Sequence, residues 1–193
     1  KWDRNNEANS IGATVFALTL SKLKDTLYND ELSKAPEGAL KPFESTLMEA
    51  LLRDSAYKFI DNINTPEKEN IHNIITRAFK GACIILTDLK TKNKLEWASF
   101  KDTHIDHLTK LPAFSRLHLP IGGGEHIINA TKAVHGPSWR MVVSLTPQTE
   151  AYGIYPGGQN GNPGSKFYDN GIDKWVKGEY FTLWVMKKNE DKD

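Results

Sequence analysis

The chain has 193 residues, of which 39% are hydrophobic and 25% are charged. It is therefore long and apolar enough to bury a sizeable core, and the composition argues against disorder. A net charge of +1 gives no electrostatic reason to expect nucleic acid as a partner. No apolar run approaches the roughly 20 residues of a membrane helix. The single cysteine, Cys83, excludes an internal disulfide and lies in an apolar run, where we expect an inert thiol.

Helical spacing of apolar residues runs through the first half of the chain. One helix is expected over residues 10–32, with Asn9 or Ser10 as its cap. A second helix is expected from Pro42, because proline suits a first helical turn, and a short third one over 57–60. The apolar positions behind these helices are Phe16, Leu20, Leu23, Leu27, Phe43, Leu47, Leu51, Tyr57, Phe59 and Ile60.

A further long helix is expected from Thr65-Pro66-Glu67 to about Thr91. A capping hydroxyl, a proline and an acid in succession are typical of a helix start. Its apolar stripe continues through Ile71, Ile74, Ile75, Phe79 and Ala82. We expect this helix to pack on the first one.

The pattern changes near Trp97, after which turns separate shorter apolar runs. Strands are expected at 127–130, 139–145, 151–155 and 181–186. The last of these is almost wholly apolar, which predicts burial of both its faces in a larger fold. If this chain is a piece of that fold, the strand should be an open edge that the absent polypeptide normally covers, and a site for self-association without it. Helices followed by strands indicate an α+β fold with a mainly antiparallel sheet region. We therefore divide the chain into a mainly helical segment, 1–95, and a strand- and loop-rich segment, 96–193.

The stretch from Tyr155 to Gly164 reads YPGGQNGNPG and cannot be ordinary helix or strand. It predicts an ordered loop with at least one glycine at positive φ. Either it is a surface shaped by close backbone approach, or it is a structural loop that crosses a neighbouring element. A short helix should follow, with Gly178 as its stop. The loop residues that we single out are Gly157, Gly158, Gln159, Gly161, Asn162 and Pro163.

Local motifs for catalysis or cofactors are missing from the sequence. His104 and His107 could share a helix face, but no HExxH motif or second ligand pair accompanies them, so we expect no metal. Gly122-Gly123-Gly124 lacks the lysine and hydroxyl of a phosphate loop and is better interpreted as a turn that admits another backbone. Ser138 does not lie in a Gly-x-Ser-x-Gly elbow.

The C-terminal third nevertheless resembles one family closely. Pro156-Gly157-Gly158-Gln159, then Gly161-Asn162-Pro163, Tyr168-Asp169, Trp175 and Gly178-Glu179-Tyr180 match the C-terminal signature of the penicillin acylase family of N-terminal nucleophile hydrolases. Gly136-Pro137-Ser138-Trp139-Arg140-Met141 is similar to another strand of that family. Weaker matches are Gly122-Gly123-Gly124, Asn129-Ala130, Asn9-Ser10 and Ala13-Thr14-Val15-Phe16.

The resemblance implies an amidohydrolase that releases an acyl group from a penicillin, cephalosporin, acyl homoserine lactone or similar amide. It implies a sandwich of two sheets between helical layers, a processed periplasmic heterodimer and no cofactor. In that family the nucleophile is the N-terminal Ser, Cys or Thr of the large chain, and Lys1 cannot serve. We therefore expect a C-terminal portion that is inactive alone. Its partners would be the upstream precursor with its nucleophile, the small chain and a small-molecule amide.

Two positions are candidates for supporting roles. The resemblance puts Glu125 at about the position of an acid that orients a histidine beside the nucleophile. His126 could equally occupy that position. The simpler interpretation is that Glu125 is a solvent-facing acid in a turn. Arg140 would form an ion pair with Asp169 or Glu179, or else contact substrate. The alternative for the whole chain is a non-catalytic binding or structural module on the same scaffold.

Overall fold

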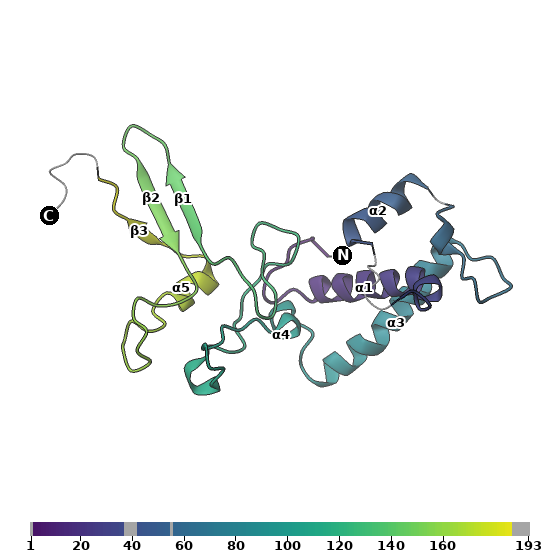
Figure 1. The fold of residues 1–193 in the computed structure, drawn as a ribbon, viewed down its shortest axis with the longest axis horizontal. Coiled ribbons are helices and arrows are strands. Elements are labelled where there is room, and N and C mark those ends of the chain that lie inside the picture. The colour runs from purple at the N-terminus through teal and green to yellow at the C-terminus, as the bar shows by residue number, and fades with distance from the viewer. Residues whose placement is uncertain (1, 37–41, 55, 187–193) are drawn as a thin grey trace. The chain divides into compact units, whose positions relative to one another are not determined.

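The computed structural model describes residues 2–36, 42–54 and 56–186 and confirms the α+β class (Figure 1). The elements in chain order are α1 (Ile11–Leu32), α2 (Glu44–Arg53), η1 (Lys58–Ile60), α3 (Ile71–Thr91), α4 (Trp97–Lys101), η2 (Pro112–Phe114), β1 (Arg140–Ser144), β2 (Glu150–Ile154), α5 (Ile172–Lys177) and β3 (Phe181–Leu183). They form two compact units. The first contains residues up to Arg4 and Ile11–Leu95, and the second contains Asn5–Ser10 and the chain from Glu96 onward.

The core of the first unit forms where α1 packs along α3, as the apolar stripes predicted. Leu27 and Tyr28 of α1 are fully buried there, against Ile74 of α3. Other core residues are Leu23, Leu47, Ile60 and Ala78. Phe16 was expected on the same buried face, but half of it is exposed. Its ring lies against that of Trp2, with centroids 5.1 Å apart.

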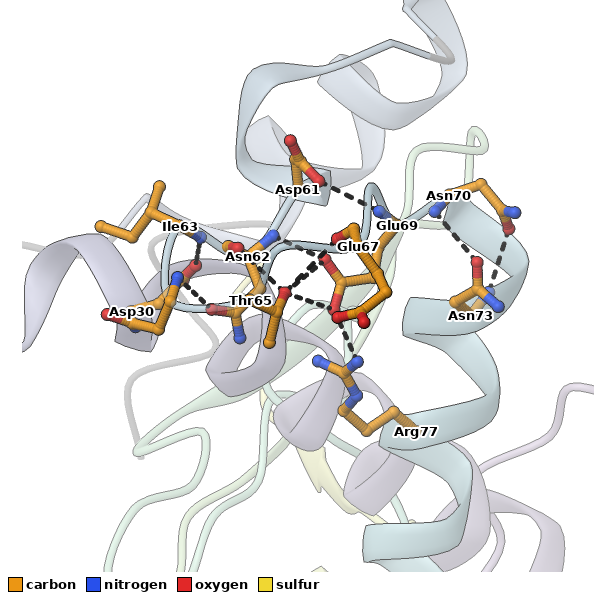
Figure 2. A network of polar contacts seen from close by, with 11 residues as sticks. Asp30, Asp61, Asn62, Ile63, Thr65, Glu67, Glu69, Asn70, Asn73 and Arg77 are labelled. Carbon is orange, nitrogen blue, oxygen red and sulfur yellow. Dashed lines mark hydrogen bonds and ion pairs between the residues drawn. The ribbon is translucent and has the colours of Figure 1, made fainter.

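Helix α3 begins at Ile71, six residues after the predicted Thr65 cap (Figure 2). The Asn70 side chain accepts from the backbone N–H groups of His72 and Asn73, and the Asn73 side chain accepts from the N–H of Asn70. This reciprocal pair is a capping box built from two asparagines. Thr65 donates instead to the carbonyl of Asn62 within the preceding connection.

Acidic side chains organise the connection between η1 and α3 (Figure 2). The Glu69 carboxylate accepts from the N–H of Asn62 at 2.9 Å and from Arg77 at 2.7 Å. Asp30, which is buried near the end of α1, accepts from the N–H of Ile63 at 3.0 Å. Burial, and after it the neighbouring Asp30 carboxyl, raise the pKa of the Glu31 carboxyl to about 7. The connection therefore has hydrogen bonds of its own, which is why the helix starts late.

The sheet of the second unit is antiparallel, with strand order β1-β2-β3. Its core contains Leu119, Ile121, Ile154, Ile172 and Trp175. The strand predicted at 127–130 is wrong, because this segment is a loop in which the Ile128 side chain is fully exposed. Burial of both faces of the last strand was predicted for the larger fold that includes the upstream polypeptide, and it stays a prediction. β3 is a three-residue edge strand, and Trp184 beyond it is 83% exposed.

Residues 5–10 belong to the second unit, whereas the sequence placed them in the helical segment. The backbone carbonyl of Asn6 accepts from the N–H of Gly123 at 2.8 Å, and that of Ala8 accepts from the N–H of Ala98 at 2.8 Å. These bonds join the start of the chain to the Gly122–Gly124 turn and to α4.

Candidate functional site

The triple glycine, Gly122–Gly124, is a turn that admits another backbone, as predicted. A Cβ on Gly122 would lie 2.6 Å from the carbonyl oxygen of Asn6, so only glycine leaves room for the backbone of residues 6–8. Gly123 has a φ of 89°, a conformation that glycine adopts without strain. The turn therefore needs both the space and the backbone freedom of glycine.

Three side chains hold the carbonyl groups of this turn. Lys101 donates from Nζ to the Gly122 oxygen at 2.7 Å and to the Thr131 hydroxyl, and Thr131 donates to the same Gly122 oxygen at 2.6 Å. The Trp97 indole N–H donates to the Gly123 oxygen. Burial lowers the pKa of the Lys101 ammonium to about 8. Among the described residues Lys101 has no carboxylate partner. The turn is therefore held by one cation, Lys101, and by two neutral donors, Thr131 and Trp97.

Glu125 follows the turn and faces solvent. Its carboxylate lies 2.8 Å from Lys132 Nζ and 3.9 Å from His126 Nε2, and about half of its side chain is exposed. The orienting role implied by the resemblance concerns a histidine elsewhere in the polypeptide and stays a prediction. Within the described part of the chain, Glu125 makes the contacts of a surface acid.

The loop 157–164 is ordered by local hydrogen bonds. The N–H of Asn160 donates to the carbonyl of Phe167 at 3.1 Å, and the Asn162 side chain accepts from the N–H of Gly164 at 2.9 Å. Gln159 donates its N–H to the side chain of Asn170, at 3.4 Å. Gly157 joins the loop to the start of α5, since its carbonyl accepts from Gly171. Pro163 is exposed.

The expected positive φ within this loop is wrong. The glycines of the described chain with positive φ are Gly123 and Gly178, and the second ends α5 as predicted. Gly158 serves a different purpose, because a Cβ there would lie 2.1 Å from the carbonyl oxygen of Tyr168. A Cβ on Gly161 would meet nothing within 4 Å. Close backbone approach, rather than unusual torsion, explains Gly158.

The expected ion pair between Arg140 and Asp169 does not form. Arg140 donates from Nη1 to the carbonyl of Trp175 and from Nη2 to the side-chain oxygen of Asn129, both at 2.7 Å. Asp169 instead accepts from Arg116 at 2.6 Å. The carboxylate is thus already taken by a different arginine.

Arg116 is a structural residue that the sequence analysis missed. Its two terminal nitrogens each reach a carboxylate at 2.6 Å, that of Asp169 and that of Asp173 on α5. The hydrogen bond to Asp169, followed by that to Asp173, raises the pKa of the Arg116 guanidinium. Because Arg116 lies more than fifty positions before its partners, no local pattern indicates the pairing.

Pockets in the described part of the second unit include three that range from about 340 to about 550 Å³. The larger pocket, of about 550 Å³, is bordered by Arg140 and Lys177 together with apolar side chains that include Ile128, Trp139 and Val142. One of about 360 Å³ lies beside β2 and β3 and is lined by residues that include Tyr152 and Trp184. One of about 340 Å³ is lined by residues that include His104, Asp106, His135, Ser138 and Trp175.

Where the structure describes the chain, His104 and His107 do not share the helix face that the sequence suggested for them. His104 and His107 lie outside any helix, and His104 Nδ1 bonds the backbone carbonyl of Asp102 while His107 Nδ1 bonds the Thr109 hydroxyl. In the described part of the chain, His, Cys, Asp and Glu side chains nowhere gather in threes with metal-binding geometry. Among the described helices, none is both long and apolar enough to cross a bilayer.

Comparison with known proteins identifies the class. The model of the penicillin amidase family matches residues 1–192, and the chain belongs to that family. Among curated relatives, acyl-homoserine lactone acylase QuiP of Pseudomonas syringae pv. tomato is 26% identical over 218 residues, covering 99% of this chain and 26% of the relative. QuiP of Pseudomonas aeruginosa is 25% identical over 225 residues, covering 99% and 27%. The chain thus spans about a quarter of the length of these relatives.

Proposed function

We propose that this chain is the C-terminal part of an amidohydrolase that cleaves an amide bond and releases an acyl group. The carrying observation is the penicillin amidase match over residues 1–192, together with relatives that are acyl-homoserine lactone acylases. Acyl-homoserine lactones are accordingly the first substrates to test, ahead of penicillins and cephalosporins.

The chemistry would be supplied by another segment of the same precursor. By resemblance to the family, that segment carries an N-terminal Ser, Cys or Thr whose α-amino group acts as its base. This chain would contribute scaffold: the rigid turn at Gly122–Gly124, the loop at 157–164 and the sheet. Its partners would be that upstream segment, the small chain and the amide substrate, in a periplasmic enzyme that uses no cofactor.

The decisive measurement is the intact mass and N-terminal sequence of the native gene product. We expect two chains, the larger beginning with Ser, Cys or Thr and containing this sequence at its end. That complex should release homoserine lactone from an acyl-homoserine lactone, while the 193-residue chain alone should not. Turnover by the chain alone, abolished by one substitution within it, would contradict the proposal. A native product that contains this chain but hydrolyses no amide would favour a non-catalytic module. Cell fractionation tests the periplasmic location.

A further inference from the structure

Arg140 is a partly buried cation whose described partners are all neutral. Its Nη1 and Nη2 donate to the Trp175 carbonyl and to the Asn129 side chain, and its guanidinium carbon lies 4.9 Å from the centroid of the Trp175 ring. A guanidinium has five N–H donors, and these bonds use two of them. The ion pairs of the described residues include none with Arg140, so its positive charge is not neutralised there.

The contrast with Arg116 is informative. Arg116 is held by two carboxylates, whereas Arg140 is held by two uncharged oxygens. Burial lowers the pKa of the Arg140 guanidinium. The titratable neighbour that opposes this effect is Tyr180, not a carboxylate. A buried charge is normally paired, because removing it from water costs free energy. Arg140 is therefore fixed in position while its charge remains available to an anion.

The 550 Å³ pocket beside Arg140 has matching chemistry. Lys177 adds a second cation to the pocket. Among the described residues that line this pocket, none is an aspartate or a glutamate. Ile128, Trp139 and Val142 contribute apolar surface, and the Ile128 side chain is fully exposed. The volume lies within the roughly 300–1,000 Å³ typical of small-molecule sites.

We propose that this pocket binds a carboxylate with an apolar body, such as a medium-chain alkyl carboxylic acid. The carboxylate would accept from the unused N–H groups of Arg140, with Lys177 nearby, because charge-assisted bonds to guanidinium are among the strongest that proteins make. The alkyl chain would lie on the apolar side chains. The inference goes beyond the proposed function, since it concerns binding by this chain itself. Amide hydrolysis nevertheless releases acids of this class.

Calorimetric titration of the 193-residue chain with octanoate tests the proposal, with octanamide as the matched uncharged ligand. Octanoate should bind roughly tenfold or more tightly than octanamide, the ratio expected for a charge-assisted hydrogen bond. The Nε–H resonance of Arg140 should shift with octanoate and not with octanamide. Equal affinities for octanoate and octanamide, or no binding of octanoate, would overturn the proposal. A peptide that contains glutamate serves as a further ligand, and its binding in the absence of octanoate binding would also overturn the proposal. Because the readout is binding, its failure leaves the catalytic proposal standing.

A charge placed at the pocket provides the specificity control. Ile128→Glu adds a carboxylate to a fully exposed pocket residue, so the fold should persist while octanoate affinity falls by roughly tenfold. Leu145→Glu adds the same charge at another highly exposed apolar residue, outside the pocket lining, and should leave octanoate affinity unchanged. Equal effects of the two variants would show that octanoate responds to net charge and not to this pocket, which would overturn the proposal.

Discussion

Gly158 and Gly161 lie in the same loop, but backbone atoms crowd the first and leave open space around the second. The two glycines are therefore a matched pair for substitution. In Gly158→Ala the new Cβ would lie 2.1 Å from the Tyr168 oxygen and 2.2 Å from that of Phe167. Ordinary carbon–oxygen contacts lie near 3.3–3.6 Å. The two segments must therefore separate by about 1 Å, which breaks the bond between the Asn160 N–H and the Phe167 carbonyl. Overpacking at about 1–3 kcal/mol and a lost hydrogen bond at about 1 kcal/mol predict a loss of about 2–4 kcal/mol.

In Gly161→Ala the Cβ meets nothing, and φ lies outside the left-handed region. Alanine should then be neutral or stabilise by up to about 1 kcal/mol, because it restricts the unfolded chain. Thermal melts followed by circular dichroism should place Gly158→Ala roughly 4–16 °C below the parent and Gly161→Ala at or slightly above it. Two variants that both melt within a degree of the parent, or a larger loss at Gly161, would refute the role of close backbone approach.

Three further predictions concern charge and capping. The pKa of Lys101 is about 8 in the folded chain against 10.5 ordinarily, so the unfolded chain holds more protons between these values and stability should rise with pH there. Lys101→Met should flatten that rise by about 1–2 kcal/mol, allowing for the partly solvated amine, and parallel urea curves from pH 8 to 10 would contradict this. The pKa of Glu31 is about 7 against 4.5, so the folded chain holds the extra proton and stability should fall as pH rises from 4.5 to 7. Glu31→Gln should remove that slope in urea titrations, and an unchanged slope would contradict the raised pKa of Glu31. Asn70→Ala should cost about 1 kcal/mol by the same assay, whereas Asn64→Ala, a non-capping asparagine in the same connection, should cost less. Equal losses would contradict the assigned cap.

Patterns among residues close in sequence predicted several helices and strands correctly. The apolar spacing around Leu23 and Leu27 located α1, the alternating run at 139–145 located β1, and Gly178 marked the end of α5. The start of α3 was missed because Thr65-Pro66-Glu67 is a sound local signal in a segment where Glu69 and Asp61 provide other hydrogen bonds. Local propensity is a weak prior when such contacts compete with it.

The pairing of distant side chains was not predictable from one sequence. Asp169 has an arginine as its ionic partner, but the sequence alone does not distinguish Arg116 from Arg140 as that arginine. Only the fold brings Arg116 to that carboxylate and gives Arg140 two neutral acceptors instead. For the same reason, the unneutralised charge beside the larger pocket was not visible before the structure.

The placement of residues 5–10 has a consequence for synthesis on the ribosome. Asn6 and Ala8 are synthesised before Gly123 and Ala98, whose backbone N–H groups donate to their carbonyl groups and which emerge roughly 90 to 120 residues later. At about 5–20 residues per second, that interval lasts on the order of 5–25 s. During it α1, α2 and α3 can already assemble, while the carbonyl groups of residues 5–10 still lack their backbone N–H donors. In a nascent chain halted before residue 120, the helical unit from Ile11 to Leu95 should therefore resist protease, while residues 5–10 should still be cleaved.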